Sequence, residues 1–173
     1  MTESGLLCTG VPTEDELAAS PGYPRPEDLA RGPIAVIECL QEIPCNPCEA
    51  ACAQGAITVG EPITNLPRFD ASKCTGCGLC IAACPGQAIF VVHSNYAPAE
   101  AAVTFPYEFL PLPERGQMVN AVNRAGEVVC QARVLRVTLR RAFDRTAVIT
   151  IAIPQAYAQQ VRGIERLGRA SAL

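Results

Sequence analysis

The sequence predicts an α+β fold, in which a cysteine-rich core of two repeated units is joined to a small antiparallel β domain. Residues 44–59 and 76–92 share the pattern Cys-x2-Cys-x3-Cys, then a turn with Gly and Gln, then Ala-Ile and a β-branched run. A repeat of this length implies two copies of one unit related by a pseudo-twofold axis. Beyond residue 102 the pattern is that of β-strands, whereas five prolines before residue 34 restrict helix and sheet alike. We therefore expect three parts: a proline-rich N-terminal arm (1–33), a core that holds the cysteines (34–98), and a β-rich docking domain with a C-terminal helix (99–173).

The composition limits the class of protein. The chain has 173 residues, ten cysteines and a formal net charge of −3. It has no apolar run long enough to mark a membrane helix, and its first residues, MTESGLLCTG, lack the features of a secretory signal. We expect a cytoplasmic protein, in which cysteines serve as metal ligands or redox groups rather than as a disulfide framework.

Charge is unevenly distributed along the chain. Residues 1–70 carry eleven acidic and three basic side chains, whereas residues 71–173 carry eleven basic and six acidic ones. Nearly all the cations are arginines, which are enriched at protein interfaces. A bias in amino-acid usage explains the arginines equally well, and so does a solvated sheet face for the five that gather in the tail: Arg133, Arg136, Arg140, Arg141 and Arg145.

The first half of the chain has few regular elements. The segment TEDELAA predicts a short helix in the arm, because Thr13 and Glu16 form a capping box. IAVIE, from residue 34, is a strand candidate. Residues 58–73, between the two repeats, are interrupted by glycine and prolines and predict a hairpin and loop, and residues 93–102 are typical of a linker.

The second half is predicted to be mainly β. Two strands meet at residues 123–126, where Gly126 suits a positive φ. The apolar side changes phase near Val134–Arg136, which indicates a bulge. A further strand over 146–154 ends at Pro154, which opens the expected C-terminal helix. An apolar stripe would mark one face of that helix: Tyr157, Val161, Ile164 and Leu167.

The cysteine spacing predicts iron–sulfur chemistry. The second repeat reads Cys-x2-Cys-x2-Cys-x3-Cys-Pro, the bacterial run for [4Fe–4S] clusters, whose last cysteine ligates the other cluster. The flanking glycines, Gly76 and Gly78, allow a positive φ and let backbone N–H groups approach the sulfur atoms. We expect Pro85 to end the helical turn and to shield the cluster from water.

The first repeat supplies a second set, with x5-x2-x3 spacing because LQEIP separates its first two cysteines. Each repeat then gives three ligands to its own cluster and one to the other, so we expect the protein without clusters to be poorly folded. The expected ligands of cluster I are Cys39, Cys45, Cys48 and Cys84, and those of cluster II are Cys52, Cys74, Cys77 and Cys80.

Zinc is the main competing interpretation of the cysteines. Zinc also binds paired cysteines, but two runs in a three-plus-one arrangement argue against it. If Cys39 does not ligate, cluster I becomes a three-iron or labile site. The eight ligands fill two clusters, so Cys8 and Cys130 are left over, and we expect them to be buried small apolar side chains. His93 is expected to be an ordinary histidine, because no carboxylate or second histidine accompanies it.

Residues 37–92 resemble a bacterial ferredoxin domain with two [4Fe–4S] clusters. The combination of ECLQEIPCNPCEAAC, DASKCTGCGLCIAACPGQAI and the tail segments PYEFLPLP and AVNRAGEVV also resembles the small iron–sulfur subunits of FAD-dependent amine or amino-acid dehydrogenases, such as those for hydroxyproline, proline and sarcosine. This resemblance implies a hetero-oligomer with a flavoprotein subunit that carries FAD, and a small [2Fe–2S] subunit. The first repeat departs from the ferredoxin pattern in its x5 spacing and in Ala53, where proline is usual.

The expected function is that of an electron-transfer subunit of an oxidoreductase complex. The chain shows no nucleotide-binding motif and no nucleophile–histidine arrangement, so no catalytic site is expected in it. A free-standing soluble ferredoxin is the alternative, although the segments outside the core argue against it. A structural cluster in a nucleic-acid-binding protein is disfavoured, because the net charge is negative and the arginines lack a set of interleaved aromatic residues for base stacking.

Overall fold

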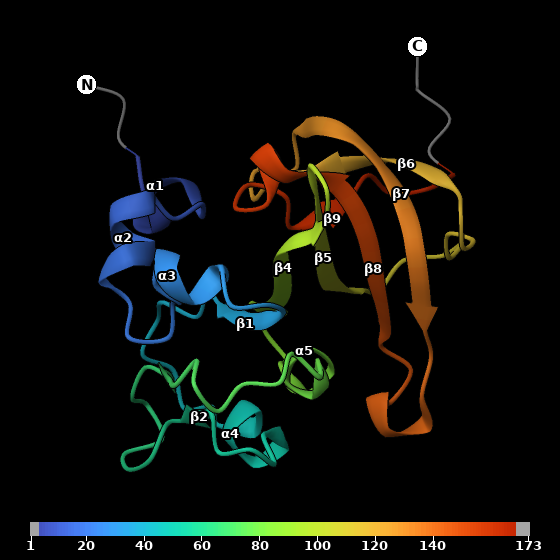
Figure 1. Ribbon diagram of the computed structural model, residues 1–173. Coiled ribbons are helices and arrows are strands. Elements are labelled where there is room, and N and C mark those ends of the chain that lie inside the picture. The colour runs from blue at the N-terminus through green and yellow to red at the C-terminus, as the bar shows by residue number, and fades with distance from the viewer. Residues whose placement is uncertain (1–3, 169–173) are drawn as a thin grey trace.

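The computed structural model describes residues 4–168 and confirms the α+β class. A curved antiparallel sheet forms one side of the molecule, and the N-terminal helices and the cysteine-bearing segment lie on the other (Figure 1). The seven strands of this sheet, in spatial order, are β1 (Ile34–Ile37), β4 (Ile89–Ala97), β5 (Glu100–Tyr107), β8 (Ala147–Pro154), β7 (Val128–Thr138), β6 (Met118–Val122) and β9 (Gly163–Ile164).

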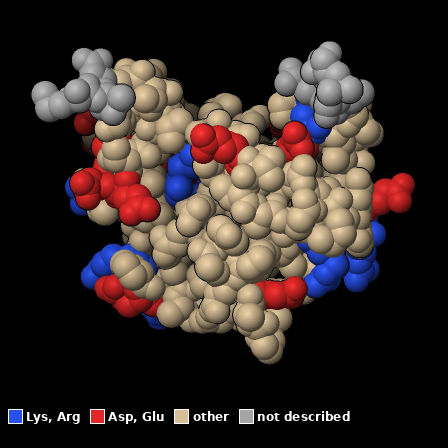
Figure 2. Space-filling model, turned by 90° about the horizontal axis from the view of Figure 1, so that it is seen from above, with Lys and Arg blue, Asp and Glu red and all other residues tan. Residues whose placement is uncertain are grey.

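The N-terminal arm folds into three short helices: α1 (Leu6–Thr9), α2 (Glu14–Ala19) and α3 (Pro26–Leu29). The predicted capping box is confirmed at α2, where the Thr13 side chain accepts the Glu16 N–H and the Glu16 carboxylate accepts the Thr13 N–H. Leu17 and Leu29 are buried, and the arm packs on the enclosed core of the sheet through Leu29 and Tyr23. Seen from above, acidic side chains gather on the side of the N-terminal helices, and a group of basic side chains lies at the opposite edge (Figure 2).

The cysteine-bearing segment contains two helices of equal length, α4 (Pro47–Ala51) and α5 (Leu79–Ala83), which pack against each other. A two-stranded sheet of β2 (Ile57–Thr58) and β3 (Arg68–Phe69) follows α4, in agreement with the hairpin and loop predicted there. One helix and one following strand thus come from each repeat.

Strands β1 and β4 separate two apolar cores. Ile34 and Val36 point into the core that the curved sheet encloses, while Ala35 and Ile37 point toward the cysteines. The same alternation occurs on β4 and reflects the period of two in a strand. Because successive side chains serve different cores, these two strands join the cysteine segment to the sheet as one packed body.

The linker predicted over 93–102 is wrong. His93–Ala97 belong to β4, Glu100–Ala102 begin β5, and the two strands form a hairpin with a turn at Pro98–Ala99. Alanine-rich, proline-interrupted sequence has little strand propensity, and here the pairing of β5 with β8 along its whole length stabilises it. The predicted domain boundary at 98/99 therefore falls in the turn of a hairpin within a continuous sheet.

The C-terminal β pattern is largely confirmed. Strands β6 and β7 are joined at residues 123–126 with Gly126 at φ 81°, and the register shifts between Val134 and Arg136, where a bulge was predicted. Ile149, Ile151 and Ile153 on β8 all point into the enclosed core, as their alternation predicts. The β7–β8 connection contains a 3₁₀ turn, η1 (Arg141–Phe143), which packs against α5.

The predicted C-terminal helix is wrong within the described part of the chain. After Pro154 there is a 3₁₀ turn, η2 (Gln155–Tyr157), and then β9. The predicted apolar residues are nevertheless inside, since Val161 and Ile164 are buried in the enclosed core. Backbone N–H groups that a helix would use internally instead pair with β6, where Arg162 donates to the Val122 carbonyl and Glu165 to the Asn120 carbonyl, each at 2.9 Å.

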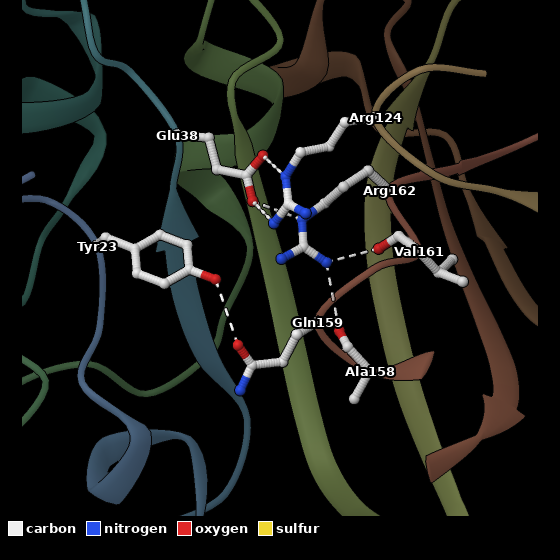
Figure 3. A network of polar contacts seen from close by, with 7 residues as sticks. All are labelled: Tyr23, Glu38, Arg124, Ala158, Gln159, Val161 and Arg162. Carbon is white, nitrogen blue, oxygen red and sulfur yellow. Dashed lines mark hydrogen bonds and ion pairs between the residues drawn. The ribbon is translucent and has the colours of Figure 1, made fainter. Parts of the chain in front are cut away.

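A buried charge network joins the cysteine segment to the far edge of the sheet (Figure 3). Glu38, which follows β1, accepts hydrogen bonds from Arg124 Nε at 2.8 Å and Nη2 at 2.6 Å, and from Arg162 Nε at 2.7 Å. The Arg162 side chain is only 4 % exposed, and its Nη1 donates to the carbonyls of Ala158 and Val161. This network connects residues more than eighty positions apart in the sequence.

Candidate metal centres

Each set of four thiols that the spacing predicts as one ligand set lines a single cavity. Cys39, Cys45, Cys48 and Cys84 line the first, and Cys52, Cys74, Cys77 and Cys80 line the second. Part of each cavity opens to solvent. The two cavities are nearly equal in size, which fits two copies of the same bound group.

Helices α4 and α5 distribute the thiols between the cavities. Each helix carries one cysteine, Cys48 or Cys80, within its length and ends at another, Cys52 or Cys84. The helix-terminal residues Cys52 and Cys84 donate their N–H groups to the carbonyls of Glu49 and Ile81, which closes the last turn. A five-residue helix thus turns its last thiol toward the cavity of the other repeat.

Backbone N–H groups point at three of the sulfur atoms. Ala56 donates to Cys52 Sγ at 3.3 Å, and Ala88 donates to Cys84 Sγ at 3.4 Å, each from four residues further on. These two bonds are related by the repeat. Cys74 Sγ accepts from Ala35 and from Gly76, both at 3.4 Å. Such bonds stabilise a sulfur that carries negative charge, and hydrogen bonds to sulfur are among the factors that set cluster potentials.

The glycine at position 76 is required by both space and conformation. Gly76 has φ 65°, and a Cβ there would lie 2.4 Å from the Pro33 carbonyl oxygen. Gly78 also has a positive φ, 76°, and caps the start of α5. The chain can therefore wrap closely around the second cavity, as predicted from the two glycines.

Burial and neighbouring thiols raise the pKa of three of the cavity cysteines, Cys39, Cys48 and Cys80, when no metal is bound. Burial raises the pKa of Cys80 to about 12, with additional effects of Cys74, Cys77 and Cys52. Burial, followed by the charge of Cys84, raises the pKa of Cys48 to about 11 and also raises that of Cys39. Since thiolates are the ligands, binding of a positively charged group must displace these protons, which couples occupancy to pH.

The donor set fits a polynuclear group. Four thiols line each cavity, and thiols are the ligands that iron–sulfur clusters use. Apolar residues such as Ile37, Ile57 and Ile89 form part of the walls. Among residues 4–168, no group of three or more His, Cys, Asp or Glu side chains is arranged to hold a single metal ion. Pro85 lines the first cavity, next to Cys84, as expected of a shielding ring.

The remaining candidate residues lie elsewhere. Cys8 is exposed on α1, so the expectation that it is buried is wrong; this helix contributes no buried side chain. Cys130 is half-buried on β7, where it packs against the enclosed core. His93 is half-buried on β4 and contacts the ring of Tyr96 edge to face.

Several residues near the cavities were not singled out from the sequence. Gln41 and Ile43, within the LQEIP insertion, line the first cavity, and Asn65 joins them from the loop between β2 and β3. Phe143, nearly a hundred residues from Cys48, packs in the same apolar cluster. The insertion itself was the only signal for Gln41 and Ile43; nothing local to Asn65 or Phe143 pointed to the site.

Comparison with known families supports the interpretation of this segment. Residues 43–88 match a family model described as a 4Fe–4S dicluster domain. The eight cysteines between residues 39 and 84 fit two [4Fe–4S] clusters, and the segment serves electron transfer through them. The sequence resemblance to a dicluster ferredoxin domain is thereby confirmed, whereas no comparison bears on the resemblance to subunits of amine or amino-acid dehydrogenases.

Three curated relatives are subunits of oxidoreductases. The chain is 32 % identical over 98 residues to F(420)H(2) dehydrogenase subunit I of Methanosarcina mazei; the aligned region covers 52 % of this chain and 55 % of that protein. It is 49 % identical over 47 residues to the B subunit of the ion-translocating oxidoreductase complex of Methanosarcina acetivorans, covering 27 % of this chain and 17 % of the relative. Over 45 residues it is 44 % identical to the B subunit of the Na(+)-translocating ferredoxin:NAD(+) oxidoreductase complex of Acetobacterium woodii, covering 26 % and 13 %.

The match thus spans 55 % of the length of the first of these relatives, and 17 % and 13 % of the other two. No solved structure matches it significantly. In the part of the chain that the structure describes, no helix is long and apolar enough to cross a membrane.

Proposed function

We propose that this chain is an electron-transfer subunit that relays electrons from a flavoprotein dehydrogenase subunit to an acceptor. The observation that carries the proposal is the pair of adjacent cavities, each lined by four cysteines, within a segment that matches a 4Fe–4S dicluster domain. A cluster of this kind transfers one electron at a time. Two clusters that each accept one electron suit a flavin, which releases two electrons.

We assign Cys39, Cys45, Cys48 and Cys84 to cluster I, and Cys52, Cys74, Cys77 and Cys80 to cluster II. Each set lines one cavity, and the pKa of a buried thiol in each set responds only to thiols of its own set. The inclusion of Cys39, in spite of the five-residue insertion before Cys45, rests on its place in the wall of the first cavity. The exchange of Cys52 and Cys84 makes each cluster a link between the two repeats.

The residues of the chain hold the clusters and limit their contact with water. The N–H groups of Ala35, Ala56 and Ala88 neutralise part of the charge on the sulfur atoms. Ile37 and Ile81 are fully buried beside the thiols and reduce solvent access, which contributes to the potential. Because α4 and α5 pack against each other, the two cavities are neighbours, which favours electron transfer between the clusters.

The partner follows from the resemblance to small subunits of FAD-dependent amine and amino-acid dehydrogenases. The flavoprotein subunit would oxidise the amine, a small [2Fe–2S] subunit completes the hetero-oligomer, and this chain has no catalytic site of its own. Arg136, Arg140, Arg141 and Arg145 support a docking role for residues 99–173, because all four are exposed and have no ion-pair partner among residues 4–168. Arg133, also exposed, pairs with Glu100.

Anaerobic purification of the tagged chain from its own host tests the proposal. About eight iron and eight acid-labile sulfide atoms per chain are expected for two [4Fe–4S] clusters, together with a flavoprotein in fixed stoichiometry. Stoichiometric zinc without sulfide would refute the cluster assignment. Full cluster content in a stable monomer, with no flavoprotein at any salt concentration, would refute the role as a subunit and leave a free-standing ferredoxin.

A further inference from the structure

The insertion in the first repeat forms one side of the mouth of the cluster I cavity. Leu40–Pro44 separate Cys39 from Cys45, where a bacterial ferredoxin run has two residues. Gln41 and Ile43 line the cavity, and Ile43 donates its N–H to the Gln41 carbonyl in a tight turn. This turn leaves the Ile43 residue 44 % exposed, directly beside the bound group that the cavity would hold.

A second loop also contributes to the wall of this cavity. The Ile63 carbonyl accepts the Cys45 N–H at 3.1 Å, which holds this loop against a cluster I thiol. Asn65 lines the cavity and donates from its side chain to the Val59 carbonyl at 3.2 Å. Ile63 itself is 37 % exposed. Two branched apolar side chains therefore face solvent on loops that both meet Cys45.

The two loops themselves carry charge of one sign. Residues 38–66 contain four glutamates and no lysine or arginine. Glu38 is neutralised by Arg124 and Arg162, and the Glu49 carboxylate accepts the N–H groups of Val59 and Gly60. The two others, Glu42 and Glu61, lie within two residues of the exposed isoleucines and are themselves exposed, with no ion-pair partner in residues 4–168.

The mouth of the second cavity differs. Neither cavity lining contains a charged side chain, but the first includes an exposed large apolar side chain, Ile43, and the second includes none. Ile63 does not line the cavity itself but lies two positions from Asn65, which does. Leu110 and Leu139 are exposed elsewhere, with no cavity-lining residue within two positions, and single exposed apolar residues of that kind are ordinary. The combination of exposed apolar side chains, unpaired carboxylates and a cluster cavity occurs at cluster I.

We propose that this rim, formed by Glu42, Ile43, Glu61 and Ile63, is the surface through which cluster I exchanges electrons with a redox protein whose own surface is apolar at the centre and basic at its edge. The inference rests on the proposed function and specifies the chemistry of one partner. Carboxylates attract such a partner and orient it during encounter. Ile43 and Ile63 then exclude water where the two redox groups approach most closely, in the way that apolar centres of interfaces do.

A basic one-electron acceptor provides the test. The protein with both clusters is reduced anaerobically with dithionite, freed of excess reductant, and mixed with ferric cytochrome c, a basic protein with an exposed haem edge. One electron passes from a reduced cluster to each ferric haem, and stopped-flow absorbance follows haem reduction. The double variant Glu42→Lys/Glu61→Lys is expected to be about tenfold slower at low salt and to lose most of the salt dependence.

Matched controls separate a local rim from an effect of net charge. Glu114→Lys/Glu127→Lys makes the same charge change at exposed positions outside both cavities and is expected to leave the rate within about twofold. Ile43→Ser/Ile63→Ser tests the apolar part and is expected to slow transfer also at high salt, unlike Leu110→Ser/Leu139→Ser. Reduction of ferricyanide, which requires no docking surface, should not become slower in any of these variants.

The outcomes are distinct. Equal slowing by both charge-reversal pairs, or slowing by neither, would overturn the rim as a docking surface, as would an unchanged dissociation constant for oxidised cytochrome c at low salt. Failure of dithionite to reduce any cluster, seen before the acceptor is added, would instead refute the proposed function. Iron and sulfide content of each variant, equal to that of the unchanged protein, shows that a slower rate does not come from cluster loss.

Discussion

The Glu38 network provides the sharpest prediction about stability. Glu38→Gln keeps the shape of the side chain and removes its charge, which leaves the Arg162 guanidinium buried, with a side chain 4 % exposed, and without its counter-ion. Breaking a buried pair by removing one partner costs about 3–5 kcal/mol of unfolding free energy, since an uncompensated charge remains. Arg124, at 17 % exposure, regains part of its hydration and contributes less to this cost.

The expected loss corresponds to a fall in Tm of roughly 6–20 °C, because 1 kcal/mol shifts a domain of this size by about 2–4 °C. Far-UV circular dichroism of the anaerobic, cluster-loaded protein follows the transition. Since unfolding of a metalloprotein departs from two-state behaviour, variants are compared at one scan rate. The matched control is Glu114→Gln, an exposed glutamate outside the network. If the Tm values of the two variants lie within about 2 °C of each other, the Glu38 network does not stabilise the fold by the expected amount.

A second variant tests the cause of the loss. Replacing both Glu38 and Arg162, as Glu38→Gln/Arg162→Met, removes the buried unpaired charge and is expected to recover part of the stability. Recovery is incomplete, because Arg162 also donates to the carbonyls of Ala158 and Val161. A double variant less stable than Glu38→Gln alone would show that packing of the Arg162 side chain, rather than charge, dominates.

The same carboxylate makes stability depend on pH. Burial acts to raise the pKa of Glu38, but the hydrogen bond from Arg124 and the charges of Arg162 and Arg124 outweigh it, so the pKa is lowered from 4.5. A group with a lowered folded-state pKa stabilises the fold above its unfolded value, and that stability is lost as pH falls through the folded pKa. The stability difference between the unchanged protein and Glu38→Gln should therefore persist at neutral pH and shrink below about pH 4.5, which Tm measured over a pH series checks.

Three further predictions concern the cavities. Cys39→Ser should reduce iron and sulfide by about half or convert cluster I to a three-iron form visible by EPR, whereas Cys130→Ser should keep the full content; equal content in both would exclude Cys39 as a ligand. Gly76→Ala places a Cβ 2.4 Å from the Pro33 carbonyl oxygen at a φ of 65° and should lower cluster content and Tm, while Gly86→Ala, with open space around it, should not. Removal of the clusters with a chelator under oxidation should abolish the cooperative transition seen by circular dichroism, since the ligands from the two repeats are then no longer held together; an unchanged transition would contradict that account.

Local sequence was sufficient to predict the grouping of the thiols around the cavities. Three cysteines of each set lie within ten residues of one another, so chain geometry alone limits which of them can surround one cavity. The fourth, Cys52 or Cys84, follows from the length of a five-residue helix. The bulge at Val134–Arg136 and the turn at Gly126 were predictable for the same reason, because phase and glycine conformation are local properties.

The two wrong predictions, the linker over 93–102 and the C-terminal helix, occurred where long-range strand pairing competes with local conformational preference. Residues 93–102 have the composition of a linker, but β5 pairs with β8 about fifty residues away and becomes a strand. The apolar stripe after Pro154 was correctly assigned to the interior but wrongly to a helix, because β6 accepts the backbone N–H groups of Arg162 and Glu165.

The chemistry of the protein was already encoded in its cysteines, because residue type and spacing are covalent properties of the chain and supply two groups of thiols before any tertiary contact forms. The attachment of this core depends on the fold, through β1 and β4 as part of a seven-stranded sheet and through Glu38 with two distant arginines. The fold also decided that the insertion before Cys45 would present Ile43 to solvent beside a cavity. The physical reason is that burial, charge pairing and strand pairing depend on which distant segments meet, and a single sequence without its fold does not specify those neighbours.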